Sequence, residues 1–292
     1  MDDELFEVLT QMNLNNVVLV SLNDFESPEL LALKNKRTRA EYCWTCTPSI
    51  IKYVFAEYKV SECVYLDADL FFFSDPETIY NDLKDDVIIV DHRLPKTPKW
   101  QKIEKENGRF CVEFNYFNNS ENSQVILDWW VDACIKWCFA RNENGKYGDQ
   151  KYLENIYNDF NRVKVENHKG VGVAPWNICD YILINNDNFD IDLKYNNEKA
   201  KLIFYHFASI RYITNDVVNI STNGKNKNIK VAIYYPYLKL INQIRVYLKH
   251  EYNIDFEIKK SYSNNLIRKF LQKYLRQFKI NSKSDIVFLK KI

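Results

Sequence analysis

One stretch decides how the rest of the chain is interpreted, and it reads Cys63-Val64-Tyr65-Leu66-Asp67-Ala68-Asp69-Leu70-Phe71-Phe72-Phe73. Asp67 and Asp69 interrupt an apolar run that has the length of a buried strand. Because an unpaired carboxylate inside an apolar strand is costly, we expect both at the strand's C-terminal end. Open α/β sheets bind ligands at that end, and paired carboxylates there suit a divalent cation bound to phosphate oxygens. The alternative, a turn with two solvated acids, fits the apolar flanks less well.

The composition excludes several classes of protein. The chain has 292 residues, which is enough for one large or two small domains, and its 46% hydrophobic residues can form a substantial core. A net charge of +1 argues against a nucleic-acid partner. From Lys249 to the C-terminus there are 11 Lys and Arg against 4 Asp and Glu. This basic tail suggests peripheral contact with an anionic membrane surface, and a solvated helical face is the alternative.

The cysteines and the N-terminus suggest a compartment. Seven cysteines, an odd number scattered over a long chain, favour free thiols in a reducing environment over a disulfide framework. Cys43 and Cys46 have C-x-x-C spacing, but Cys134 and Cys138 have the wrong spacing for a zinc knuckle and neither pair lies in a turn-like segment, so we expect buried free thiols and not a zinc site. The start is acidic, unlike a signal peptide, and no apolar run reaches membrane-spanning length. We expect a cytoplasmic protein, peripheral at the inner membrane face.

The hydrophobic pattern predicts alternating helices and strands. Helices are expected at 2–12, from the Ser27 cap onward, and at 41–58, 74–83, 122–141, 237–252 and 263–278; strands are expected at 17–20, 63–69, 87–90, 110–117, 163–165 and 202–207. This alternation indicates an α/β fold whose sheet is mostly parallel in the first half. The cationic run before the 41–58 helix is either a solvated loop or a phosphate contact through Arg37 and Arg39.

Three later motifs are candidates for chemistry, and each has a structural alternative. They are Gly148-Asp149-Gln150-Lys151-Tyr152-Leu153, Ala174-Pro175-Trp176-Asn177 and Tyr205-His206-Phe207. Asp149 has the position of a helix cap. A single histidine after an apolar run, such as His206, is more often a core residue than a ligand.

Taken in order, these motifs resemble those of a known family. A helix with Tyr42 and Pro48, then the Asp67/Asp69 motif and the three later motifs, resembles the GT-A nucleotide-sugar glycosyltransferases over about residues 4–207. The similarity is greatest to the retaining glycogenin-like and lipopolysaccharide-galactosyltransferase group. It implies a Rossmann-like, mixed, mostly parallel sheet flanked by helices. The catalytic domain would span 1–214, followed by a basic helical extension at 229–292.

The resemblance implies a role for each matching residue. Asp67 and Asp69 would hold Mn²⁺ or Mg²⁺ on the diphosphate of a UDP-sugar, and His206 would be the third protein ligand. Asp149 would hydrogen-bond the sugar hydroxyls, and Gln150 would lie beside the anomeric carbon. The acceptor would be a glycan or a lipid-linked sugar.

The chain departs from the family pattern at several places. It begins within what looks like the helix after the family's second strand, so we expect an N-terminally shortened version. Trp44 stands where the family usually has Arg, and Glu113 falls where it has the Gly of Asn-x-Gly. Ser209 and Tyr212 replace the Gly and Lys that follow the family's His. These departures concern the base site and part of the donor-sugar site, whereas the metal-site residues match.

We therefore expect a metal-dependent glycosyltransferase that acts in bacterial surface-polysaccharide synthesis. A non-catalytic relative that binds sugar or a partner protein is the first alternative. The second is a phosphotransferase of the haloacid-dehalogenase type with Asp67 as nucleophile. That class has a small residue and Thr or Gly after the second Asp, whereas this chain has bulky apolar residues there.

Overall fold

The computed structural model describes residues 3–81, 84–187, 189–220, 227–255 and 286–292. The chain divides into two compact units, the first made of Met1–Ala68 and Glu77–Asn167 and the second of Asp69–Pro76 and His168–Ile292. Each unit has its own cluster of buried apolar side chains. Within the described ranges, no helix combines the length and the apolar character that a membrane crossing requires.

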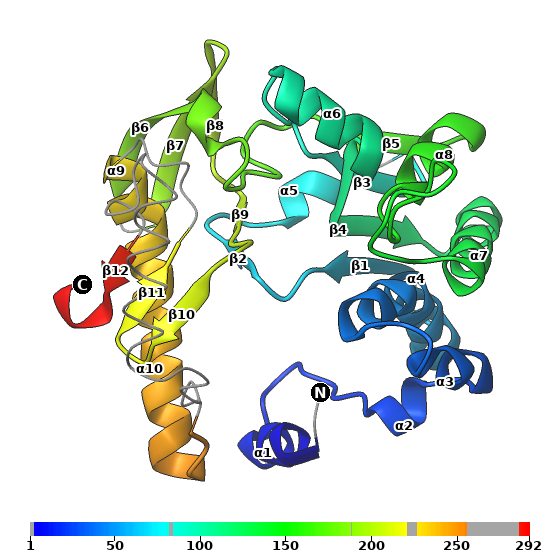
Figure 1. Cartoon of the computed structure of the whole chain (residues 1–292), viewed down its shortest axis with the longest axis horizontal. Coiled ribbons are helices and arrows are strands. Elements are labelled where there is room, and N and C mark those ends of the chain that lie inside the picture. The colour runs from blue at the N-terminus through cyan, green and yellow to red at the C-terminus, as the bar shows by residue number, and fades with distance from the viewer. Residues whose placement is uncertain (1–2, 82–83, 188, 221–226, 256–285) are drawn as a thin grey trace. The chain divides into compact units, whose positions relative to one another are not determined.

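The first unit is built on a sheet with the strand order β1-β4-β3-β5 (Figure 1). The strands are β1 Glu62–Leu66, β3 Val87–Asp91, β4 Phe110–Asn118 and β5 Val163–Glu166. β4 pairs antiparallel with both β1 and β3, and β3 pairs parallel with β5. Three of the four strands therefore run in one direction, and β4 runs against them inside the sheet.

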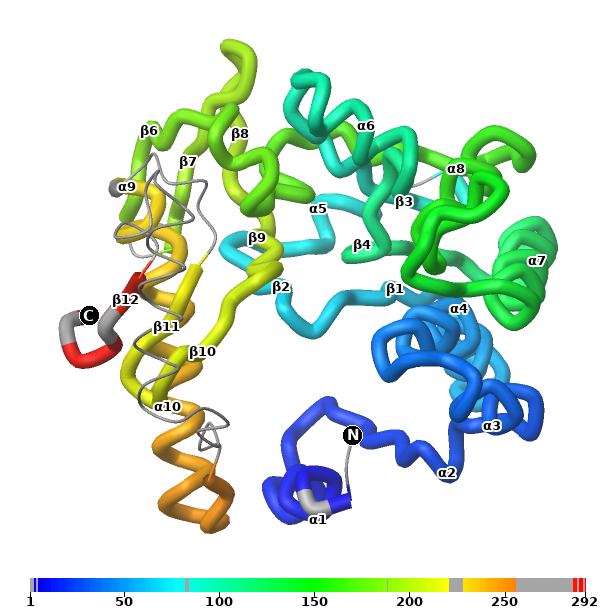
Figure 2. The backbone as a smooth tube through the Cα atoms, viewed as in Figure 1, coloured from blue at the N-terminus to red at the C-terminus, as the bar shows by residue number. Residues whose placement is uncertain are grey.

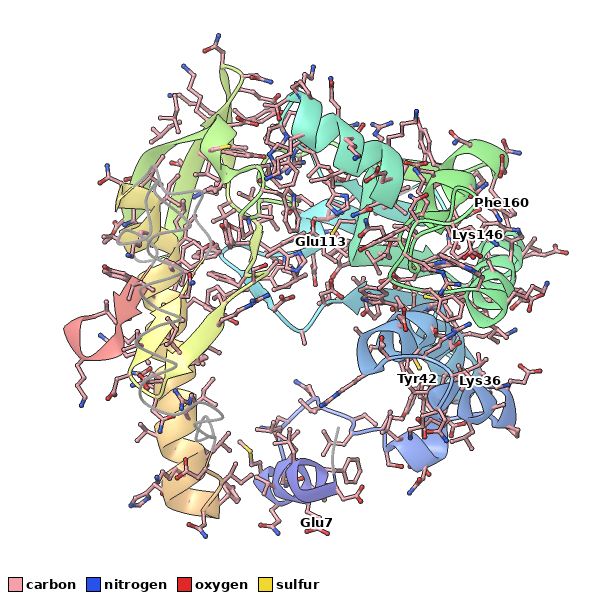
Figure 3. All side chains as sticks on the ribbon, in the orientation of Figure 1. Glu7, Lys36, Tyr42, Glu113, Lys146 and Phe160 are labelled. Atoms are coloured by element: carbon pink, nitrogen blue, oxygen red, sulfur yellow. The ribbon has the colours of Figure 1, made fainter. Side chains whose placement is uncertain are left out.

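Helices of the first unit supply most of its remaining core. They are α1 Asp3–Met12, α2 Leu22–Phe25, α3 Pro28–Lys34, α4 Arg39–Tyr58, α5 Glu77–Tyr80, α6 Pro98–Asn107, α7 Glu121–Lys136 and α8 Tyr152–Asp159. α4 and α7 pack side by side, as the tube in Figure 2 shows. Thr38 begins α4 with a capping box, because its hydroxyl accepts from Glu41 N while the Glu41 carboxylate accepts from Thr38 N. Tyr42, labelled in Figure 3, donates to Glu26 Oε1 at 2.8 Å and ties α4 to the preceding segment.

The second unit holds short sheets and one long helix. Its elements are β2 Leu70–Phe72, η1 Ile178–Asp180, β6 Tyr181–Asp187, β7 Asp190–Tyr195, β8 Glu198–Lys201, β9 Phe204–His206, β10 Arg211–Thr214, β11 Val217–Asn219, α9 Lys227–Ile229, η2 Lys230–Tyr234, α10 Tyr235–Tyr252, β12 Ile286–Phe288 and η3 Leu289–Lys291. β2 pairs with β9, and β6, β7 and β8 form an antiparallel sheet. Buried aromatic residues fill the core, and the ring of Phe207 stacks on that of Tyr237 at 3.8 Å.

Most of the expected elements are present with similar bounds, and the mixed α/β class is confirmed. The expectation of a mostly parallel sheet holds for strand direction but not for pairing, since only β3–β5 is a parallel pair. The reason is that the reversed strand β4 lies between two strands of the opposite direction. The hairpins of the second unit, β6–β7 and β7–β8, were not expected from the sequence.

Four predicted elements differ from the structure. The strand expected at 63–69 ends at Leu66, three residues before Asp69, and its residues are half-buried or exposed because β1 is the edge strand of its sheet. Residues 17–20 are not a strand: Val17 is 49% exposed and Val18 68%, because no strand of the described chain pairs with them. The polar segment with Pro95 and Pro98, whose composition predicts a loop after the 87–90 strand, contains a helix, α6, for which Pro98 is the first residue. The 122–141 helix ends at Lys136. The predicted helix at 263–278 lies outside the described residues, so the basic helical extension at 229–292, which begins with α9 and α10, stays a prediction.

Candidate functional site

Asp67 lies where the sequence places it, directly after a strand. β1 ends at Leu66, and the backbone N–H of Asp67 extends its ladder by donating to the Glu113 carbonyl of β4 at 3.0 Å. The Tyr65 hydroxyl donates to Asp67 Oδ1 at 3.0 Å. Tyr65 precedes Asp67 by two residues, so the strand period puts both on one face. This hydrogen bond fixes the direction of the carboxylate.

Asp149 belongs to the same unit, and contacts of the backbone at residues 148 and 149 fix its position. The buried Trp130 indole N–H donates to the Asp149 carbonyl at 3.1 Å. Gly148 has a φ of +51°, and a Cβ there would lie 3.3 Å from the Trp44 ring, so glycine lets the chain pass close to α4. Asp149 is not the cap of the next helix, because α8 begins at Tyr152 with Lys151 at its N-cap.

The carboxyl group of Asp149 lies in an unusual environment. The residue is 3% exposed, and its Oδ2 is buried with no hydrogen-bond partner. Burial raises the pKa of Asp149 to about 7, although the Thr47 hydroxyl and nearby backbone amides lower it; the charge of Asp67 raises it further. A buried carboxyl oxygen without a partner is costly in a folded protein, so its persistence here marks a candidate ligand contact.

Gln150, Arg39 and Arg37 lie in three different settings within the first unit. Gln150 is half-buried, and its Nε2 donates to the Asn107 carbonyl at 2.8 Å. Arg39 is exposed at the first residue of α4. Arg37, in contrast, is buried and donates to Thr45 and to the Ile135 carbonyl, the latter at 2.7 Å. Arg37 thus binds a backbone carbonyl in the last turn of α7. It is a buried structural residue, which differs from both the solvated loop and the phosphate contact that the sequence suggested.

The second unit brings Asp69 and His206 together. β2 and β9 pair so that Leu70 faces His206, and the Phe207 N–H donates to the Asp69 carbonyl at 2.8 Å. This register places Asp69 Oδ1 2.9 Å from His206 Nε2. The side chain of His206 is 8% exposed and that of Asp69 47%. His206 is therefore buried, but it contacts a carboxylate and is not surrounded by apolar side chains alone.

Neighbouring groups set the charge and the orientation of this pair. Partial burial opposes ionisation of Asp69, but the hydrogen bond and the charge of His206 outweigh it and lower the pKa of Asp69. The Trp176 ring lies edge-on to the imidazole at 5.3 Å. The loop that carries Trp176 is fixed by Asn177, whose amide accepts from Ala174 N at 2.9 Å and donates to the Gly172 carbonyl at 2.8 Å.

The Asp69–His206 pair has a geometry that a metal ion could use. Two neighbouring ligands of an octahedral ion with bonds of about 2.1 Å lie about 3.0 Å apart, close to the separation of Oδ1 and Nε2. A mixed carboxylate and imidazole set favours Mn²⁺ over Mg²⁺, because Mg²⁺ prefers oxygen ligands. These two residues thus fit the expected divalent cation.

Two residues that contact the candidates were not expected from the sequence: Tyr65 orients Asp67, and Thr47 acts on Asp149. Tyr65 had a usable signal, its spacing of two residues from Asp67 on a strand. Thr47 approaches Asp149 through tertiary packing, which spacing along the chain does not encode. Trp176, which packs on His206, belongs to one of the predicted motifs, but the sequence did not predict this contact.

Comparison with known proteins gives relatives that are themselves uncharacterized. No family model matches the chain. It is 29% identical over 220 residues to the uncharacterized protein YfnF of Bacillus subtilis (strain 168), a match that covers 73% of this chain and 71% of YfnF. It is 31% identical over 244 residues to the uncharacterized protein YfnD of the same organism, covering 81% of this chain and 76% of YfnD. With identity at that level over most of both sequences, the chain belongs to the family of YfnD.

Proposed function

We propose that this chain is a metal-dependent glycosyltransferase of the GT-A fold, related to the retaining glycogenin-like and lipopolysaccharide-galactosyltransferase group. It transfers a sugar from a UDP-sugar to a glycan or lipid-linked acceptor in bacterial surface-polysaccharide synthesis. The observation that carries the proposal is the Asp69–His206 pair at 2.9 Å. Asp69 and His206, which lie far apart in the sequence and which the resemblance assigns to one metal, meet within the second unit.

Asp67 would complete the proposed metal site, because it is close to Asp69 in the sequence. Only Ala68 separates it from Asp69, and consecutive Cα atoms are about 3.8 Å apart, so the two Cα atoms lie within about 7.6 Å. Asp67, Asp69 and His206 together would hold Mn²⁺, or Mg²⁺. When bound, the ion neutralises the charge that develops on the departing diphosphate.

The first unit supports the proposal through its sheet. Asp67 follows the C-terminal end of β1, and β3 and β5 end at the same edge because they run in the same direction. Open α/β sheets bind nucleotides at this edge. A sheet of this kind, with one reversed strand and helices packed on it, is compatible with a Rossmann-like domain.

Asp149, Gln150 and Arg39 would bind the donor. Asp149 has a buried oxygen without a partner, and a sugar hydroxyl would satisfy it. Gln150 follows directly and would lie beside the anomeric carbon, where an amide oxygen stabilises an oxocarbenium-like transition state. Arg39 is exposed and would contact the donor phosphates.

Calorimetric titration of UDP into the purified chain tests the proposal. We expect binding in the presence of Mn²⁺ and none after chelation. Asp69→Ala should abolish the metal-dependent binding, whereas the matched control Asp132→Ala, which removes an exposed carboxylate on α7, should leave it unchanged. Equal UDP affinity with and without Mn²⁺, or in Asp69→Ala and wild type, would contradict the metal site.

A screen of common UDP-sugars separates the alternatives. Hydrolysis or transfer with any donor supports the transferase. UDP binding without turnover on every donor would instead support a non-catalytic relative. A trapped phosphoaspartate at Asp67 would support the phosphotransferase of the haloacid-dehalogenase type.

The basic tail is the basis for proposing membrane contact at the cytoplasmic face. The excess of Lys and Arg from Lys249 onward would attract anionic lipids. Removal of residues 264–292 should weaken co-sedimentation with vesicles of anionic lipid, and equal sedimentation of both chains would contradict this contact.

A further inference from the structure

The last turn of α6 is bound by the loop that carries Asp149 and Gln150. Three side chains of this loop, which includes Lys146 (labelled in Figure 3), donate to consecutive carbonyls of α6. The pairs are Lys151 Nζ with the Lys105 carbonyl at 3.0 Å, Asn142 Nδ2 with the Glu106 carbonyl, and Gln150 Nε2 with the Asn107 carbonyl at 2.8 Å.

These contacts matter because α6 is short and packs only partly against its surroundings. It is ten residues long and none of its residues is buried. A helix of that length is marginal in water by itself, and the carbonyls of its last turn have no partner within the helix. The three donors supply those partners, so the end of α6 and the loop depend on each other.

The contact with Asn107 decides which way the Gln150 amide points. A backbone carbonyl oxygen can only accept a hydrogen bond, so the NH₂ group of Gln150 must face it. The Oε1 atom is then directed away from α6. Among the hydrogen bonds of the described residues, none engages Oε1. Gln150 therefore presents a neutral acceptor oxygen with a partial negative charge, and it follows the buried Asp149 directly in the sequence.

We propose that the last turn of α6 positions Gln150 for the reaction, with Asn142 and Lys151 as positioning residues. This inference rests on the proposed function. It goes further by naming the contacts that keep the Oε1 atom of Gln150 directed away from α6. If the amide were free to flip, its NH₂ group would face the positive charge that develops on the sugar ring in the transition state. Such a flip would destabilise the transition state and lower kcat, while binding of the donor would change little.

The kinetic test uses the full chain with Mn²⁺ and the UDP-sugar found active in the screen. Asn142→Ala and Lys151→Met, alone and combined, remove two of the three donors. We expect the double variant to lower kcat at least tenfold while KM for the donor and the affinity for UDP change less than twofold. Lys151→Arg restores a donor and should recover most of kcat. Lys102→Met is the control, since this lysine lies on α6 with its side chain 74% exposed and makes none of these contacts.

A second measurement does not depend on activity. In protein labelled with ¹⁵N-glutamine, the Gln150 side-chain NH₂ protons should exchange slowly in wild type and Lys102→Met, and quickly in the double variant. Unchanged exchange in the double variant would overturn the positioning, whether or not the chain is a transferase. Fast exchange with unchanged kcat would overturn its catalytic role. A joint rise in KM and fall in thermal midpoint would show that the contacts only stabilise the fold.

Discussion

The difference in stability between Asp149→Asn and wild type should favour the variant more at alkaline pH than at acid pH. The folded state holds the pKa of Asp149 at about 7, against an ordinary value of 3.8, because the carboxyl is buried. Between these two values the folded chain binds a proton that the unfolded chain has released. The contribution of this group to the free energy of unfolding is therefore fully present below pH 3.8. It falls as the pH rises from 3.8 through about 7, and it is lost above that.

The magnitude follows from the size of the pKa change. Each pKa unit corresponds to about 1.4 kcal/mol, so a rise from 3.8 to about 7 makes the ionised carboxyl cost on the order of 4 kcal/mol of folding free energy above pH 7. At pH 5 the same relation gives a smaller cost, on the order of 2 kcal/mol. The amide of Asp149→Asn has no proton to release, so the variant does not lose this free energy. Any pH-independent effect of the new amide is the same at both pH values and cancels in the comparison.

Urea unfolding at pH 5, 6, 7 and 8 measures this difference directly. The free energy of unfolding of Asp149→Asn minus that of wild type should rise by about 1.4 kcal/mol per pH unit up to about pH 7 and then level off. Asp132→Asn is the matched control, because its carboxylate is exposed on α7. A difference that stays constant from pH 5 to 8 would refute the claim that burial raises the pKa of the Asp149 carboxyl.

Three further changes test particular contacts. Gly170→Ala would place its Cβ 1.7 Å from the Lys201 carbonyl oxygen, so we expect a loss of about 3 kcal/mol or more of unfolding free energy in urea, and normal stability would contradict this close approach. Thr38→Ala removes the capping box of α4 and should cost about 1 kcal/mol in the same assay, with Thr38→Ser close to wild type. Tyr65→Phe removes the hydrogen bond to Asp67 and should weaken Mn²⁺-dependent UDP binding about tenfold, as measured by calorimetry. Its free energy of unfolding should fall by no more than about 1 kcal/mol. An unchanged UDP affinity would show that Tyr65 does not orient Asp67 for binding.

The sequence predicted best those elements whose signals are local. Ser27 accepts from Leu30 N as the N-cap of α3, and Pro28 occupies the first turn, both as the pattern indicates. Continuous apolar runs also identified β3 and β4, because strands buried on both faces show no alternation. Residues 17–20 show the limit of this reasoning. This apolar run forms no strand, and Val17 and Val18 are exposed, since strand formation depends on a neighbour that local sequence does not supply.

The site was predictable only where chemistry and spacing agreed. The position of Asp67 at the end of β1 follows from the cost of a carboxylate inside a strand. The pairing of Asp69 with His206 does not follow from spacing, because it depends on the register of β2 against β9. Without the family resemblance, His206 would have been interpreted as a core residue. The contact between Gln150 and α6 was out of reach, because the sequence pattern indicated a loop where α6 forms.

The pKa values of Asp69 and Asp149 shift in opposite directions, and this assigns them different roles. Partial burial opposes ionisation of Asp69, but the contact with His206 outweighs it and lowers the pKa, so the carboxylate is ionised at neutral pH, as a ligand to a cation must be. The pKa of Asp149 is raised by burial to about 7, so near neutral pH it can accept a hydrogen bond as a carboxylate or donate one as an acid. A sugar hydroxyl can meet either need, whereas a diphosphate would repel the carboxylate. Under the proposed function, these opposite shifts are consistent with a metal and diphosphate at Asp69 and a sugar at Asp149.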